Sequence, residues 1–185
     1  MYKMSKRIIV SKNKPLFQTW INTNHLKEVQ EFIDKERQKR HITGLNFSKL
    51  SLFSIYIIKE IFEKMKLKEK NKIHDIYSFQ NKIRKELNLN EKLPIMTRSA
   101  NKISKPISCK DEVLQKEIAG FIELLHEREI KNASLSIMAI FSCNCIIDIY
   151  NKLPESTKEK TNHIYDIQYF IREQLNLDTT NYRYI

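Results

Sequence analysis

The sequence matches itself when it is shifted by 88 positions. In this alignment Phe53-Ser54 meets Phe141-Ser142 without a gap. Further identical pairs at the same shift are Ile58 and Ile146, Ile61 and Ile149, Lys64 and Lys152, Ile76-Tyr77 and Ile164-Tyr165, Gln80 and Gln168, Ile83-Arg84 and Ile171-Arg172, and Leu87-Asn88-Leu89 and Leu175-Asn176-Leu177. Self-similarity at a fixed period indicates that one structural unit occurs twice. We therefore predict two tandem units of about 88–90 residues, one at 1–94 and one at 95–185.

Each unit is predicted to be all-α, as a bundle of three helices. Residues 48–66 carry apolar side chains on nearly all sides of a helix, which indicates that this helix is central and buried. Apolar residues spaced by three and four at 24–40 and 75–88 indicate amphipathic helices beside it. The corresponding helices of the second unit are expected at 111–129, 134–152 and 163–176. The chain has only 2 Gly, and so few turn-forming residues argue against a β-sandwich or a barrel.

The positive charge of the chain is concentrated in its first half. The formal net charge is +11. Residues 1–94 carry 21 Lys and Arg against 10 Asp and Glu, whereas residues 95–185 carry 12 of each kind. An excess confined to one half favours a polyanion as its partner. A composition rich in Lys, Asn and Ile is also typical of an AT-rich genome, and this alternative stays open.

The first unit is therefore predicted to bind nucleic acid through its N-terminal arm, its loops and the linker that follows it. Basic side chains bind DNA or RNA phosphates in a salt-dependent, sequence-tolerant way, because each neutralised phosphate releases counterions. The candidate residues are Lys12, Lys14, Arg37, Lys39, Arg40, Lys66, Lys68, Lys70, Lys72, Arg98, Lys102 and Lys105. In the second unit the loop at 158–161 contains acid, so that unit is expected to pair with the first or to bind a protein.

No pattern of residues predicts catalysis. The two glycines cannot form a glycine-rich phosphate loop, which excludes Walker and Rossmann sites. The five histidines are scattered, and Cys143-x-Cys145 lies on a predicted helix, where residues two apart point to different sides. We expect no enzymatic activity, no cofactor and no metal. The three cysteines are expected to be reduced in an intracellular protein, because they form an odd and sparse set.

We also predict neither a signal peptide nor a membrane-spanning segment. The apolar run at 8–10 is too short for a signal peptide, and the most apolar stretch, 135–150, is too short and too polar to span a bilayer. The expected location is the cytoplasm, the nucleus, a virion or an infected host cell.

The sequence leaves open the roles of two polar residues that recur in the second unit and of the single tryptophan. Gln80 and Arg84 recur in the second unit, and a core does not require polar identity. A cap or a hydrogen bond within each unit is the expected role. The single Trp20 is expected to pack in the core or against the linker, and base stacking is the alternative.

Two short motifs resemble a core histone. Thr43-Gly44-Leu45 precedes Ser48-Lys49, and the helix that follows contains Glu60-Ile61-Phe62-Glu63-Lys64-Met65. Together they look like the first loop and the central helix of the histone fold. Phe79-Gln80-x-x-Ile83-Arg84-x-x-Leu87 is similar to the third helix of the same family, and the second unit keeps a weaker form of it.

This resemblance implies a tandem histone doublet of the kind described for large DNA viruses. The two units would form an intramolecular handshake dimer. Basic loops would lie beside DNA phosphates, with an Arg entering the minor groove. The predicted function is non-enzymatic, architectural or regulatory nucleic-acid binding. The alternative is a duplicated all-helical protein-interaction module, such as a viral or phage inhibitor or adaptor that binds a host protein or nucleoprotein complex. A homodimer is compatible with both.

Overall fold

The structure is a computed structural model and describes residues 10–11, 14–95 and 101–180. Its first four helices are α1 (Thr23–Arg40), α2 (Phe47–Lys64), α3 (Leu67–Lys70) and α4 (Ile76–Glu86). The other four are α5 (Glu112–Glu127), α6 (Leu135–Lys152), α7 (Glu155–Lys158) and α8 (Ile164–Gln174). The prediction of a largely helical fold is confirmed, and the six expected helices lie close to their predicted bounds. The short helices α3 and α7 were not expected.

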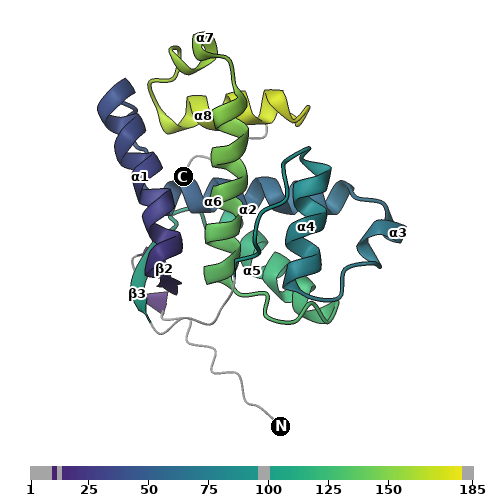
Figure 1. Cartoon of the computed structure of the whole chain (residues 1–185). Coiled ribbons are helices and arrows are strands. Elements are labelled where there is room, and N and C mark those ends of the chain that lie inside the picture. The colour runs from purple at the N-terminus through teal and green to yellow at the C-terminus, as the bar shows by residue number, and fades with distance from the viewer. Residues whose placement is uncertain (1–9, 12–13, 96–100, 181–185) are drawn as a thin grey trace.

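The central helices α2 and α6 pack against each other in the middle of the molecule (Figure 1). Every residue of α2 from Leu50 to Ile58 is buried, as the all-round apolar pattern predicts. In α6 the run from Ile137 to Cys143 is likewise buried. Residues of both halves, 1–94 and 95–185, contribute to one hydrophobic core around these two helices.

A small antiparallel sheet departs from the all-α prediction. Its strands are β1 (Val10–Ser11), β2 (Lys14–Asn22) and β3 (Lys102–Ser108), in the order β1-β2-β3. The side chains of Thr19, Ile21 and Ile107 are buried, whereas that of Trp20 is 60% exposed. This alternation has the period of two that a half-buried strand requires. Residues 102–108 were expected to be linker, because so short a run carries little pattern of its own.

The loops adopt left-handed backbone conformations at positions separated by 88 residues. A positive φ occurs at Gly44 (71°) and at Asn132 (65°), where the chain turns before each central helix. Glycine and asparagine tolerate this conformation better than most residues. The further pairs are His41 with Glu129 and Asn88 with Asn176.

Two isolated bridges link the halves in a reciprocal way. Thr43, in the loop after α1, pairs in parallel with His163, directly before α8. Lys131, in the loop after α5, pairs in parallel with Asp75, directly before α4. Each half therefore contributes one loop before its central helix and one loop before its last helix.

Buried ion pairs connect the last helix of each half to the central helix of the other half. The guanidinium of Arg172 in α8 donates to both carboxylate oxygens of Glu60 in α2, at 2.7 and 3.0 Å. Arg84 in α4 donates to the carboxylate of Asp148 in α6 at 2.7 Å. Arg172 is 0% exposed. These contacts between the halves were not predicted, because the sequence indicated only hydrogen bonds within each unit.

The expected bonds within each half are present as well. The Nε of Arg84 donates to the carbonyl of Asn90, and the Nε of Arg172 donates to the carbonyl of Asp178, both at 2.6 Å. The side-chain amide of Gln80 donates to the carbonyl of Ile95 and accepts from its N–H, and thus binds the first residue after the predicted boundary at 94. Each arginine therefore fixes the chain after its own helix and also binds the opposite half.

Replacing Arg172 with Met is expected to lower the free energy of unfolding by about 3–5 kcal/mol, because it leaves the Glu60 carboxylate without its buried cation. Urea unfolding measures this loss. The matched control is Lys27→Met, which breaks an exposed pair with Glu31 at 3.7 Å and should cost less than about 1 kcal/mol. Equal losses in the two variants would contradict the role assigned to Arg172.

Candidate nucleic-acid interface

The two bridges define two loop pairs. The first loop pair consists of residues 41–46 and 159–163, which meet at the Thr43–His163 bridge. The second loop pair consists of residues 71–75 and 128–134, which meet at the Asp75–Lys131 bridge. Each loop pair therefore combines residues from both halves of the sequence.

Basic residues of the second half lie beside the first half at the second loop pair. Arg128 donates to the side-chain oxygen of Asn71 at 3.1 Å, which places it beside the first half. Lys131 is exposed. Sequence reasoning missed both residues, because the second half has no excess of positive charge.

Two of the predicted lysines next to this loop pair are exposed and have no ion-pair partner among the described residues: Lys66 and Lys68, at the start of α3. Lys70 donates to the carbonyl of Glu63 at 2.8 Å, and its ammonium lies 5.3 Å from the ring centre of Phe62. The loop 65–72 therefore presents some of its cations to solvent and uses others to fix its own backbone.

Glu69 reduces the positive charge of the same loop. Its carboxylate contacts the ammonium groups of Lys82 and Lys72, the latter at 2.9 Å. These two cations, Lys82 first, lower the pKa of Glu69 to about 2. Glu69 therefore stays ionised near neutral pH, and Lys72 is already paired in the folded protein.

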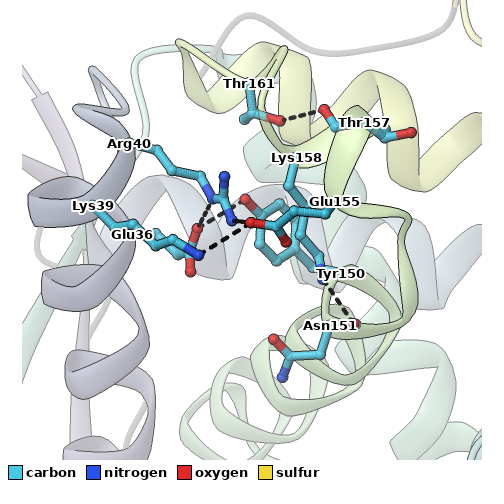
Figure 2. A network of polar contacts seen from close by, with 9 residues as sticks. All are labelled: Glu36, Lys39, Arg40, Tyr150, Asn151, Glu155, Thr157, Lys158 and Thr161. Atoms are coloured by element: carbon cyan, nitrogen blue, oxygen red, sulfur yellow. Dashed lines mark hydrogen bonds and ion pairs between the residues drawn. The ribbon is translucent and has the colours of Figure 1, made fainter.

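Next to the first loop pair, Arg40 lies in an internal polar network (Figure 2). Its side chain is 8% exposed and donates to Glu36 at 2.9 Å and to Glu155 at 2.5 Å. Lys39 also contacts Glu155, at 3.1 Å. The structure therefore gives Arg40 partners within the protein, whereas Arg37, one turn before it, is exposed.

Tyr150 completes this network from the central helix α6. Its hydroxyl donates to the buried carboxylate of Glu36 at 2.9 Å, and burial together with Glu36 raises the pKa of Tyr150. Lys158 lies 5.8 Å from the ring centre of Tyr150 and donates to the carbonyl of Asn151 (Figure 2). The network joins α1, α6 and α7.

The remaining predicted residues lie elsewhere or outside the described residues. Lys102 is exposed and Lys105 is half-buried, and both lie in β3, on the opposite side of the molecule from α3 (Figure 1). Lys14 lies in β2, but its side chain is not described. Lys12 and Arg98 fall outside the described residues. The candidate residues therefore form separate groups rather than one patch.

The thiols of Cys143 and Cys145 in the central helix α6 are buried. Burial raises the pKa of Cys143 and that of Cys145 to about 12, so both thiols remain protonated near neutral pH. In the part of the chain that the structure describes, no group of three or more His, Cys, Asp or Glu side chains could hold a metal ion. Over the same residues, no helix is both long and apolar enough to cross a membrane.

Comparisons with protein-family models, with curated proteins and with solved structures find no match for this chain.

The carboxyl of Glu155 is expected to titrate near pH 2, because Arg40 and, to a lesser degree, Lys39 stabilise its charged form. Its folded-state pKa is lower than the ordinary 4.5, so the contact stabilises the fold above about pH 4.5 and is lost as the pH falls toward 2. An NMR titration of the Glu155 carboxyl measures this pKa.

The variant Lys39→Gln should move the Glu155 pKa part of the way back toward 4.5, because one of its two cations is removed. An ordinary pKa in the unchanged protein would contradict the network of Figure 2.

Proposed function

We propose that this protein is a histone-like doublet that binds duplex DNA through an interface centred on its second loop pair, without catalysis. The two halves would be copies of one unit that pair within a single chain, as the two partners of a histone handshake do. The protein would act as an architectural or regulatory component that contacts phosphates and reads no bases directly.

The reciprocal contacts between the halves support the paired arrangement. In each half, the loop before the central helix bridges the residue before the last helix of the other half. Arg84 and Arg172 repeat the same reciprocity with Asp148 and Glu60. The corresponding residues of the two contacts, Arg84 with Arg172 and Glu60 with Asp148, are separated by 88 positions, as are the identical residues of the sequence. A duplicated unit that pairs with itself explains all of these spacings at once.

The observation that carries DNA binding is the exposed charge at the second loop pair and at the start of α3, directly before it. Lys66 and Lys68 come from the first half and Lys131 from the second, and all three are exposed. Exposed lysines gain by releasing counterions from phosphates, whereas Arg40 would first have to leave Glu36 and Glu155. The proposed interface is therefore centred on the second loop pair, and residues of both halves form it.

Exposed apolar side chains favour a second candidate, a protein-interaction module. Leu93 is 93% exposed and Leu67 is 65% exposed, both in the first half. Single exposed apolar residues are common on monomeric proteins. A protein partner would bury these leucines and would show little salt dependence.

The triple variant Lys66→Gln, Lys68→Gln and Lys131→Gln is expected to weaken duplex binding similarly for all sequences. If each lysine neutralises one phosphate, the slope of log affinity against log salt should become shallower by about 2.7. Fluorescence anisotropy of a labelled duplex across a salt series measures both effects.

The control for this experiment is Lys27→Gln, Lys35→Gln and Lys116→Gln, which removes the same charge from α1 and α5, outside both loop pairs. This control should change the slope of log affinity against log salt much less than the first triple variant does. Equal effects of the two triple variants would contradict an interface at the second loop pair. A wild-type protein that binds no duplex even at low salt would contradict DNA binding and favour the protein-interaction module.

A further inference from the structure

Trp20 stands on the solvent side of the sheet, where packing does not require an aromatic residue. It is the only Trp of the chain and is 60% exposed. In the β2–β3 register Trp20 faces Ser104, and Asn22 faces Lys102. Directly paired residues lie on the same face of a sheet, so Lys102 shares this face with the indole. The opposite face carries the buried Thr19 and Ile21.

Trp20 lines a cleft of about 180 Å³. The apolar residues Ile21, Ile95, Ile137 and Ile140 line part of it. Pockets that enclose a drug-sized ligand measure roughly 300–1,000 Å³. A space of this size instead suits one planar ring that is partly open to solvent.

The polar lining of the cleft favours an anion. Lys102 and His25 line it, and among the residues that the structure describes no Asp or Glu belongs to its lining. Ser134, the N-cap of α6, also lines it, so the positive end of an 18-residue helix faces the same space.

The serine hydroxyls of this lining have protons to donate. Ser136 accepts from the backbone N–H of Trp20 at 3.1 Å, and Ser134 accepts from the N–H of Ile137 at 3.4 Å. Both oxygens are therefore acceptors in these bonds, and each O–H can be donated to an anion in the cleft.

We propose that this cleft binds one unpaired nucleotide, whose base stacks on Trp20 and whose phosphate lies near Lys102 and His25. Stacking on an aromatic side chain tolerates any base, because every base has a π-face. The inference rests on the proposed nucleic-acid binding and deepens it, since it adds a site for single-stranded or distorted DNA far from α3 (Figure 1). The position 88 residues after Trp20 is Ser108, so the aromatic ring is not repeated there.

The fluorescence of Trp20 reports directly on this site, because no other Trp contributes. Deoxyadenosine monophosphate should quench it saturably, deoxyadenosine more weakly, and inorganic phosphate not at all. Trp20→Ala should weaken binding of a short single-stranded oligonucleotide by between about five- and 150-fold and leave duplex binding unchanged. Lys102→Gln should weaken quenching by the monophosphate but not by the nucleoside.

The matched control is Tyr169→Ala, which removes another exposed aromatic ring, in α8, and should leave single-strand binding unchanged. Circular dichroism of each variant establishes that it is folded. Duplex binding without quenching by any nucleotide would overturn the Trp20 site and leave the proposed function standing. Saturable quenching without duplex binding would support the site and overturn the proposed duplex interface.

Discussion

The fold depends on two buried arginines that each bind a carboxylate from the other half of the chain. Arg172 is fully buried against Glu60, and Arg84 lies against Asp148, so neither half contains all the charges that its own core requires. A buried cation without its partner is costly, whereas a paired one that is fully hydrogen-bonded is tolerated. The same arginines also bind the backbone after their own helices, and thus couple local structure to the packing of the halves.

The two ends of this arrangement differ in chemistry. At one end Phe62 packs against Phe79 and Phe121, with ring centres 5.6 and 5.8 Å apart. At the other end the residue 88 positions after Phe62 is Tyr150, whose hydroxyl binds Glu36. The polar end holds Arg40 within the protein, and the aromatic end leaves Lys66, Lys68 and Lys131 exposed. This difference is why we centre the proposed DNA interface on the second loop pair.

The sequence predicted the helices well, because their apolar periodicity and the match at 88 positions describe the same elements twice. It did not predict β2 and β3, because their alternation covers few residues and includes an exposed Trp20. The excess of positive charge lies before residue 94, whereas the hydrophobic core contains residues from both sides of that position. The bridge between Asp75 and Lys131 places a lysine of the neutral second half beside the basic first half. This contact is seen only once the loops are paired in the structure.

Native-state hydrogen exchange tests most directly whether the two halves form one cooperative structure. The slowest amides of α2 and α6 should converge on a single free energy and a single dependence on denaturant, because the helices share one core and reciprocal ion pairs. If α6 opened at a clearly lower free energy while α2 stayed protected, the halves would be independent, and the paired arrangement proposed for them would be contradicted.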